Sequence, residues 1–386
     1  MKPADVSRFR GLNTVSDPMR LDAGWLTVAR NVHVTDQDAI ERREGFTLHA
    51  AGTITAAYGT RDYQRMYYVD AGSLKDGAGQ VLASGITAAR MHWAEVNEQV
   101  YFNNGSSSGV ITQDNQLLPW AWNVPAAPTL AAVSGSLAPG QYRVVCTLVL
   151  ADGRETGTSD EAVITIGEGQ ALQVSALPSA AGCTTRTYIA PANSQVFGLA
   201  RVGSGAFTWN ADPTALGVEC TTYGLDPLPA GATVVQIWNG RAWAALYDPT
   251  AGATFLFRSR PLAFHLFDLE DYDVLAGEVL MLAPHAQGLV VGTPTAISVF
   301  DAAGAMTIVA GYGVVPGQPW AFDEDDSILI WTTRGVCRAL PFKNLTEGYL
   351  SVAPGVHAGA AVISTGGQRR FIVSLHAGGT AFNSRN

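Results

Sequence analysis

The feature that most constrains this 386-residue chain is a recurring pattern of two short hydrophobic stretches joined by a tight turn. Alternation of apolar and polar residues with a period of two is typical of a strand with one buried face. Four segments are interpreted as strand, tight turn and strand, at residues 236–246, 288–300, 327–338 and 368–375. Their spacing of roughly 40 to 50 residues is typical of propeller blades, so they predict successive blades of one ring.

Similar hairpins are expected nearer the N-terminus. Strands are predicted at residues 65–69 and 98–102, and Asn104-Gly105 follows the second strand as a hairpin turn. With only 15% charged residues, 41 glycines and 19 prolines, the composition favours many short strands over helices. The length exceeds that of most single domains, so we expect two domains, or one large closed β domain with an insertion.

A different module is predicted between two proline clusters, at residues 124–128 and 226–229. Proline biases the preceding residue toward extended backbone, so both clusters are interpreted as linkers. Between them, a strand at residues 137–149 leads into the Asp152-Gly153 turn. Further strands are expected at residues 162–166, 171–174, 185–190 and 198–202. This succession resembles a fibronectin type III or related immunoglobulin-like sandwich.

The predicted fold class is therefore all-β: a β-propeller with an inserted immunoglobulin/fibronectin III-like β-sandwich and an extended N-terminal arm. Closure of the ring would remove exposed sheet edges. The expected boundaries are residues 1–50 for the arm and first strands, 51–123 for the first part of the propeller, 124–229 for the sandwich and 230–386 for the second part of the propeller.

The N-terminal segment combines short polar turns with repeated glycines and has no helical periodicity. It contains the sequences Arg8-Phe-Arg-Gly-Leu-Asn13, Leu21-Asp-Ala-Gly24, Ala29-Arg-Asn-Val32 and Glu41-Arg-Arg-Glu-Gly45. This succession resembles the opening of the tail nozzle, or tail hub, proteins of short-tailed bacteriophages. These proteins are also described as tail tubular protein B-like. The resemblance covers about the first fifty residues; the rest of the chain is similar only in its expected architecture.

The resemblance implies a structural virion protein that forms a homo-hexameric ring in the tail and continues the genome-ejection channel. It implies a head-to-tail adaptor ring and tail fibres or spikes as partners, and transient passage of double-stranded DNA without sequence-specific binding. The expected location is the virion tail, after synthesis in the host cytoplasm. The formal net charge of -9 fits a conduit, because proteins that bind DNA normally carry a basic stripe.

Arginines are concentrated in the N-terminal segment. The set consists of Arg8, Arg10, Arg20, Arg30, Arg42 and Arg43. Two roles are open. These side chains could pair with acidic residues of the same segment, or, as the resemblance implies, they could bind an acidic adaptor or a neighbouring subunit.

The sequence contains no motif for catalysis or cofactor binding. Nucleophile-elbow and phosphate-loop motifs are absent, and the seven histidines form neither an H-E-x-x-H motif nor an i, i+4 pair. We therefore expect no enzymatic activity, no cofactor and no metal site. No segment predicts a signal peptide or a membrane span. The cysteines are expected to be small buried residues: Cys146, Cys183, Cys220 and Cys337.

Two acidic clusters leave alternatives open. One loop is expected to carry Asp268, Glu270, Asp271 and Asp273, and another Asp323, Glu324, Asp325 and Asp326. They could form a solvated surface, a calcium site, an intersubunit salt bridge or a carboxylate pair for glycoside hydrolysis. The alternative function is therefore a propeller glycan-binding protein or glycosidase that acts on host surface polysaccharide. Tryptophans are expected mainly to pack the blades, although such residues could in principle bind sugars: Trp25, Trp93, Trp120, Trp122, Trp238, Trp243, Trp320 and Trp331.

Overall fold

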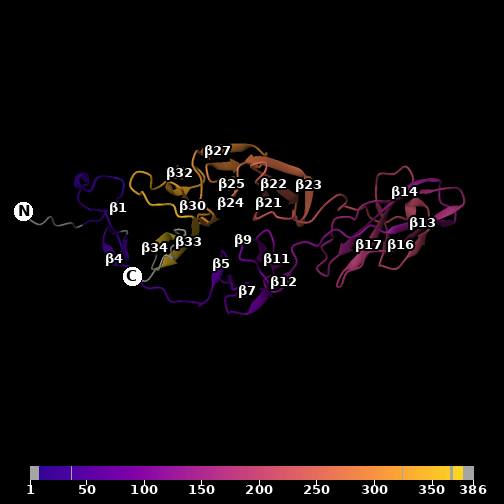
Figure 1. Cartoon of the computed structure of the whole chain (residues 1–386), viewed down its shortest axis with the longest axis horizontal. Helices are drawn as coiled ribbons and strands as arrows, with labels where there is room; N and C mark the ends of the chain where they lie inside the picture. The colour runs from indigo at the N-terminus through magenta and orange to yellow at the C-terminus, as the bar shows by residue number, and fades with distance from the viewer. Residues whose placement is uncertain (1–7, 36, 324, 366–367, 377–386) are drawn as a thin grey trace, which may run out of the picture.

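The computed structural model describes residues 8–35, 37–323, 325–365 and 368–376, and it is all-β. Within these ranges the helical segments are two 3-10 turns, Pro18–Arg20 and Pro213–Ala215. Figure 1 shows an elongated molecule with a small N-terminal unit at one end, a group of sheets in the middle and a separate pair of sheets at the other end. The predicted all-β class is confirmed.

Five four-stranded antiparallel sheets make up most of the middle part, and each uses four consecutive strands. The first two sheets are β5 (Ile54–Gly59), β6 (Met66–Asp70), β7 (Ser73–Asp76), β8 (Val81–Ser84), and β9 (His92–Val96), β10 (Gln99–Asn103), β11 (Ser108–Ile111), β12 (Leu117–Leu118). The others are β20 (Val234–Trp238), β21 (Arg241–Asp248), β22 (Ala253–Arg260), β23 (Ala263–Ala276); β24 (Met281–His285), β25 (Gly288–Gly292), β26 (Ile297–Phe300), β27 (Met306–Ala310); and β29 (Trp320–Phe322), β30 (Ile328–Thr332), β31 (Gly335–Arg338), β32 (Lys343–Asn344).

The predicted hairpins at residues 236–246, 288–300 and 327–338 are present as β20–β21, β25–β26 and β30–β31. In the first, Asn239 and Gly240 have φ values of 49° and 68°, the left-handed backbone that a two-residue hairpin turn requires. The prediction for residues 368–375 was wrong. This segment is one strand, β34 (Gln368–His376), and it pairs with β33 (His357–Thr365). A short parallel strand, β28 (Gly317–Gln318), completes this sixth, three-stranded sheet.

Apolar clusters join neighbouring sheets in chain order. Tyr67 and Trp93 belong to the cluster between the β5–β8 and β9–β12 sheets. Further clusters join the β9–β12 sheet to β20–β23, the β20–β23 sheet to β24–β27, and the β24–β27 sheet to β29–β32. A last cluster, which includes Trp331 and Ala358, joins the β29–β32 sheet to the three-stranded sheet. The β9–β12 and β20–β23 sheets therefore lie side by side although more than a hundred residues separate them in the sequence.

The separate pair of sheets lies inside the range predicted for the sandwich. One sheet has the order β15 (Ala162–Ile166), β14 (Gly140–Val149), β17 (Thr184–Ala190), β18 (Gly198–Val202), and the other β13 (Thr129–Ser134), β16 (Gln170–Ser175), β19 (Phe207–Trp209). Tyr142, Leu172 and Trp209 pack between the two sheets. We refer to this unit as the sandwich; its relation to the immunoglobulin class stays a prediction.

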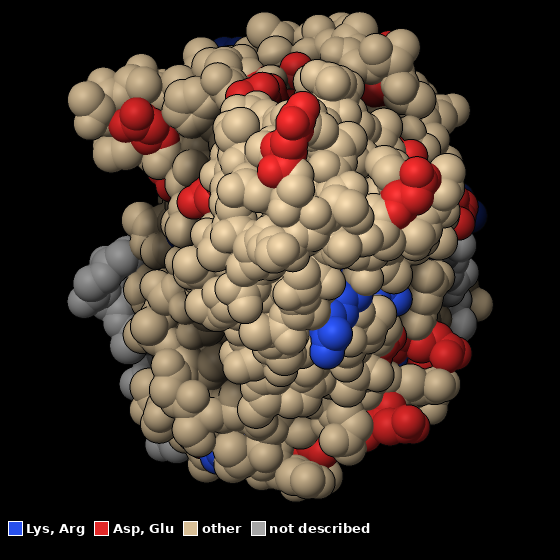
Figure 2. All heavy atoms as spheres, turned by 90° about the vertical axis from the view of Figure 1, so that its right-hand side faces the viewer, with Lys and Arg blue, Asp and Glu red and all other residues tan. Residues whose placement is uncertain are grey.

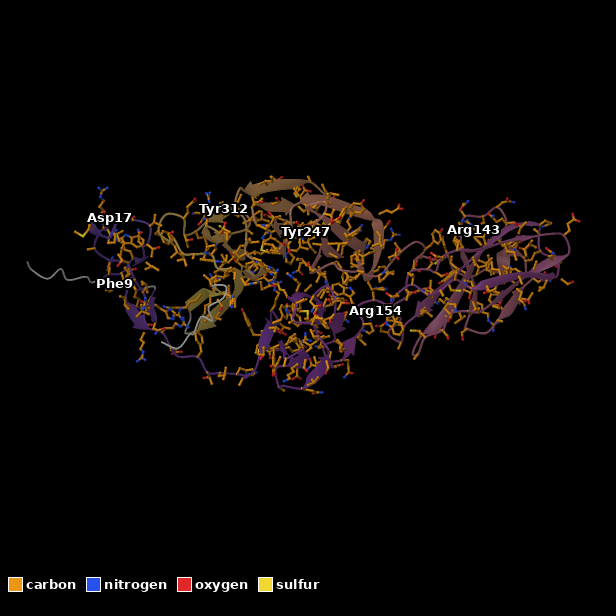
Figure 3. The ribbon with its side chains drawn as sticks, viewed as in Figure 1. Phe9, Asp17, Arg143, Arg154, Tyr247 and Tyr312 are labelled. Atoms are coloured by element: carbon orange, nitrogen blue, oxygen red, sulfur yellow. The ribbon has the colours of Figure 1, made fainter. Side chains whose placement is uncertain are left out.

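The sandwich is fixed to the middle sheets at several points. Arg154 donates hydrogen bonds to the Pro119 and Trp120 carbonyls at 2.8 and 2.6 Å. Asp226 and Phe267 exchange two backbone hydrogen bonds of 2.8 Å. Gly157 lies so close to this junction that a Cβ there would be 1.6 Å from the Leu225 carbonyl oxygen, so only glycine fits. Figure 3 shows Arg154 where the two parts of the molecule meet.

The N-terminal segment differs from the expected extended arm. Residues 8–43 form a small unit, which we call the N-terminal unit, with a parallel pair, β1 (Gly11–Leu12) and β2 (Trp25–Leu26), and an antiparallel pair, β3 (Val32–Val34) and β4 (Ile40–Arg42). Backbone hydrogen bonds between distant residues, such as Arg10 to Gly24 at 2.8 Å, hold the unit together. Only the exposed stretch of residues 44–53 is extended, and it leads to β5.

Candidate partner-binding surface and central cavity

The N-terminal unit is attached to the middle sheets through the segment after β32. The Thr14 amide donates to the Tyr349 carbonyl at 2.8 Å, and the Ser351 amide donates to the Thr14 hydroxyl at 2.8 Å. The rings of Trp25 and Tyr349 lie 5.9 Å apart. These contacts orient the unit, so its outer surface has a defined position relative to the sheets.

All six predicted arginines of this unit are exposed: Arg8, Arg10, Arg20, Arg30, Arg42 and Arg43. Arg10 pairs with Asp22 at 3.4 Å and Arg20 with Asp17 at 4.0 Å. The Arg43 guanidinium lies 4.4 Å from the centre of the Phe46 ring. Within the described part of the chain, no ion pair is formed by Arg8, Arg30 or Arg42. Pairing inside the segment therefore accounts for two of the six arginines and leaves most of them open to solvent.

Large apolar side chains are also exposed in the N-terminal unit and in the stretch that follows it. Met19 is 91% exposed and Leu48 76%, and Val28 and Phe46 are also mostly exposed. Single exposed apolar residues are ordinary, but their combination with exposed arginines is characteristic of protein interfaces, in which methionine, phenylalanine and arginine are enriched. We call the six arginines together with Met19, Val28, Phe46 and Leu48 the N-terminal surface.

A cavity of about 490 Å³ lies where the first strands of the middle sheets meet. Tyr58 comes from β5, Glu95 from β9, Gln236 from β20 and His285 from β24. The full lining is Tyr58, Arg61, Trp93, Ala94, Glu95, Gln236, Ile237, Trp238, Asn239, Pro284, His285, Ala286, Ala302, Gln318, Trp320, Phe322 and Asp326. Five sheets and β28 contribute to one central space.

Charged residues gather on one side of this cavity. The Arg61 amide and the Tyr58 hydroxyl both donate to Glu95 Oε2 at 3.0 Å. The Arg61 guanidinium pairs with Asp326 and lies 4.0 Å from the centre of the Phe322 ring. Arg61 thus connects the β5–β8 sheet to the β29–β32 sheet. Burial and then the Glu95 carboxylate raise the pKa of Tyr58, so its hydroxyl stays protonated and remains a donor.

Uncharged polar groups also line the cavity. Gln236 is only 4% exposed. Its Oε1 accepts a hydrogen bond from the Ile237 amide at 2.8 Å, while Nε2 has no partner among the residues that the structure describes. His285 Nδ1 accepts from the Gln287 amide at 3.1 Å, which assigns the proton of the neutral ring to Nε2. Both side chains therefore offer N–H donors.

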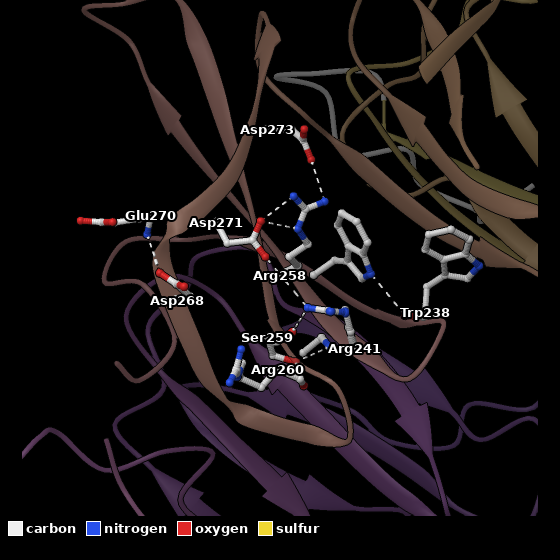
Figure 4. A network of polar contacts seen from close by, with 11 residues as sticks. Trp238, Arg241, Arg258, Ser259, Arg260, Asp268, Glu270, Asp271 and Asp273 are labelled. Carbon is white, nitrogen blue, oxygen red and sulfur yellow. Dashed lines mark hydrogen bonds and ion pairs between the residues drawn. The ribbon is translucent and has the colours of Figure 1, made fainter. Parts of the chain in front are cut away.

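The first acidic cluster is not a loop, so that prediction was wrong. Asp268, Glu270, Asp271 and Asp273 lie on the long strand β23. Figure 4 shows Arg258 between two of these carboxylates: its Nε donates to Asp271 at 2.8 Å and its guanidinium contacts Asp273 at 3.2 Å. The hydrogen bond from Arg258 lowers the pKa of Asp271. This cluster acts as an ion-pair network within one sheet.

The second acidic cluster lies in the loop between β29 and β30, as predicted. Asp323 pairs with Arg369 at 2.9 Å, and Asp326 pairs with Arg61; Glu324 lies outside the described residues. Among the residues that the structure describes, no group of three or more histidines, cysteines or acids is arranged to hold a metal ion. The calcium interpretation gains no support from these positions.

The cysteines follow the predicted pattern in part. All four are free; Cys146, Cys220 and Cys337 are buried and Cys183 is half-buried. Burial raises the pKa of Cys146 to about 11. A thiol of this kind is a poor nucleophile at neutral pH because the reactive form is the thiolate. Six of the eight predicted tryptophans are buried in the sheets: Trp93, Trp120, Trp238, Trp243, Trp320 and Trp331.

Sequence reasoning named Asp326 and three tryptophans of the lining, but it did not bring them together in a cavity and did not identify the other lining residues. Tyr58, Arg61 and Glu95 have no motif, and each looks like an ordinary strand or turn residue. The available signal was positional: in the propeller that the sequence predicted, the blades surround a central channel, and residues of their inner strands would be expected to line it. Gln236 opens one of the predicted hairpins and could have been found by that argument.

No family model matches the sequence, and no curated protein matches it. Solved structures give weak likenesses. The extracellular domain of a hybrid two-component system from B. thetaiotaomicron is 11% identical, with a TM-score of 0.31, over 77% of this chain and 32% of that one. A functionally unknown protein from Desulfotomaculum acetoxidans is 10% identical, with a TM-score of 0.32, over 86% and 91% of the two chains.

A third likeness is to a protein from Bacteroides fragilis described provisionally as a 6-phosphogluconolactonase, at 11% identity and a TM-score of 0.30 over 82% and 86% of the two chains. With TM-scores this low, these likenesses give no information about the function of this chain. In the described residues, no helix has the length and apolar character needed to cross a membrane.

Proposed function

We propose that this chain is a structural subunit of a bacteriophage tail, in which copies of it form the nozzle or hub ring that continues the genome-ejection channel. The observation that carries this proposal is the N-terminal surface. Six exposed arginines, with exposed Met19 and Val28, lie on a unit that contacts of Thr14 and Trp25 orient, and Phe46 and Leu48 are exposed on the stretch that follows it. The same segment carries the sequence resemblance to tail nozzle proteins.

The N-terminal surface would dock on an acidic surface of a head-to-tail adaptor ring or of the neighbouring copy. Arginine suits this role because its planar group binds carboxylates in a bidentate manner and is weakly hydrated. The middle sheets would form a closed propeller that serves as a rigid wall. We expect six copies in the ring, as the resemblance implies.

The two ends of the molecule differ in a way that supports assembly into a ring. Between residues 124 and 229 the sequence has four arginines and eight carboxylates. Figure 2 shows this end of the molecule, where acidic side chains outnumber the basic ones. An acidic sandwich end and an arginine-bearing N-terminal end give neighbouring copies, or fibres, complementary surfaces to bind.

The test is incorporation into virus particles. A chain in which the six arginines are replaced by glutamine should fold normally and fail to enter particles, because the exposed side chains contribute little to the fold. A matched control replaces the exposed arginines of the sandwich and middle sheets by glutamine, and it should enter particles normally; these are Arg201, Arg260 and Arg334. Immunoblots of purified particles and immunogold labelling of the tail tip give the readout.

Two outcomes would contradict the proposal. One is normal incorporation of the six-arginine variant. The other is absence of the unaltered protein from intact particles while it is abundant in the lysate, which would favour the glycan-binding alternative as the main function.

A further inference from the structure

We propose that the central cavity binds a neutral glycan segment of one or two sugar rings without cleaving it. This inference is independent of the tail assignment, because it rests on the cavity alone. The volume of about 490 Å³ lies within the range of roughly 300 to 1,000 Å³ that is typical of small-molecule sites. The cavity is open at the surface, so a chain end or a short segment can enter it.

Aromatic side chains supply the apolar part of the site. Tyr58 stacks against Trp93 with their ring centres 5.4 Å apart and an angle of 13° between the planes. Trp320 and Phe322 meet edge to face at 5.1 Å on another part of the wall. Sugar rings carry C–H groups on their faces, and these pack favourably against aromatic surfaces. The lining therefore offers apolar surfaces beside polar groups.

Uncharged hydrogen-bond donors supply the polar part of the site. Gln236 is a nearly buried side chain that lines the cavity, and its Nε2 donates to no group of the described chain, so this N–H is available to a ligand. His285 presents an N–H through Nε2, and Asn239 and Gln318 add amides to the lining. Hydroxyl groups accept and donate hydrogen bonds, so a sugar satisfies amides and an imidazole at once.

The charges of the cavity favour a neutral ligand. Its described lining holds one arginine and two carboxylates, and Arg61 contacts both carboxylates, through its amide to Glu95 and through its guanidinium to Asp326. An anionic ligand would approach a side of the cavity that already carries excess negative charge. A neutral glycan avoids this cost and leaves the Arg61 contacts intact.

The same contacts favour binding over hydrolysis. Glycoside hydrolysis needs one carboxyl group free to donate a proton and a second to act as base or nucleophile. Here Glu95 accepts two hydrogen bonds, from Tyr58 and Arg61, and Asp326 is held in an ion pair. Both carboxylates are thus already engaged by side chains and backbone of the chain itself, which leaves neither free to act on a glycosidic bond.

The test is a titration of the full chain with maltose, cellobiose, lactose and N,N'-diacetylchitobiose. Tryptophan fluorescence is the readout, since Trp93, Trp238 and Trp320 line the cavity. We expect saturable binding of at least one disaccharide below about 10 mM, and a loss of affinity of tenfold or more in Gln236→Leu. Gln287→Leu is the matched control: it changes an exposed glutamine near His285 outside the lining and should bind normally.

His285→Leu is a second cavity variant, so the proposal can still be tested if Gln236→Leu does not fold. Near-UV circular dichroism shows whether each variant is folded. Failure of all four disaccharides to bind would overturn the proposal. Equal affinity in the wild type and in both folded cavity variants would also overturn it. Tighter binding of glucose 6-phosphate than of any neutral sugar would refute the neutral class, and release of monosaccharides on prolonged incubation would refute binding without cleavage.

Discussion

His92 is a buried titratable side chain in the first strand of the second sheet. Burial, followed by the nearby Arg90 charge, lowers the pKa of His92 to about 3 from its ordinary value of 6.5. The folded chain therefore holds this ring neutral at every pH well above 3. The unfolded chain has no such restriction and takes up a proton as the pH falls below 6.5.

This difference predicts a loss of stability in acid. The contribution of His92 is fully present above pH 6.5 and is lost as the pH falls from 6.5 toward 3, because only the unfolded state gains the proton. Between pH 7 and pH 5 the loss should be about 2 kcal/mol. Urea unfolding at both pH values should show that His92→Phe reduces the pH dependence of the unfolding free energy by this amount.

The His92 prediction has a clear contrary outcome. If wild type and His92→Phe lose the same free energy of unfolding between pH 7 and pH 5, then His92 is protonated in the folded chain. Other histidines, including the half-buried His265, whose pKa is also lowered by burial, contribute equally to both proteins. The comparison therefore isolates the single side chain.

At the scale of elements, Arg154 is the side chain that ties the sandwich to the segment before it. Its side chain is 21% exposed, and it donates to two backbone carbonyls and pairs with Asp152 at 2.7 Å. Removal of these charged hydrogen bonds should make local opening of the junction easier by about 1–2 kcal/mol. The fold of each part should persist, because neither core includes Arg154.

The measurement is limited proteolysis with elastase at the linker, residues 121–128. Arg154→Ala should be cleaved there roughly 5 to 30 times faster than wild type. Arg201→Ala is the matched control, since that arginine lies on β18 and stacks on Phe207 at 5.3 Å, away from the junction. Unchanged cleavage in Arg154→Ala would show that Asp226, Phe267 and the close approach at Gly157 fix the junction without it.

Much of the strand pattern was predictable from the sequence because the signals are local. The strands at residues 162–166 and 198–202 have the predicted bounds, and the turn at Asn239 and Gly240 is set by the conformational freedom of those two residues. Alternation and turn chemistry act within a few residues, so no knowledge of the remaining chain is needed.

Other elements depend on partners that are distant in the sequence. The strands β13 and β19 were missed because their weak alternation becomes a strand only through pairing with β16. The acidic residues of β23 were assigned to a loop because consecutive charges usually indicate one, yet Arg258 on the adjacent strand neutralises Asp271 and Asp273. The cavity was missed for the same reason. Five sheets contribute residues to it, so no single segment of the sequence predicts it.

At the scale of the whole molecule, the N-terminal surface predicts an association that depends on salt. Opposite charges on two exposed surfaces attract over a distance of about 8 Å at physiological ionic strength, and added salt screens them. Binding of the purified chain to particles that lack it should therefore weaken steadily from low to high sodium chloride. The slope of log affinity against log salt should flatten when the six arginines are replaced by glutamine.

Surface plasmon resonance with immobilised particles measures this slope. An affinity that does not change with salt would mean that the exposed apolar residues, such as Met19 and Phe46, carry the contact alone. A slope that is the same in wild type and in the six-arginine variant would place the charged contact on another part of the molecule.

The side-by-side position of the β9–β12 and β20–β23 sheets also affects how the chain is made. The ribosome releases β12 more than a hundred residues before β20, and the whole sandwich is synthesised in between. At typical elongation rates this interval lasts on the order of ten seconds. During that time the apolar face that includes Tyr101 and Trp120 has no permanent neighbour. At this stage the nascent chain exposes an apolar surface to which chaperones can bind. The length of the inserted sandwich sets how long that surface stays exposed.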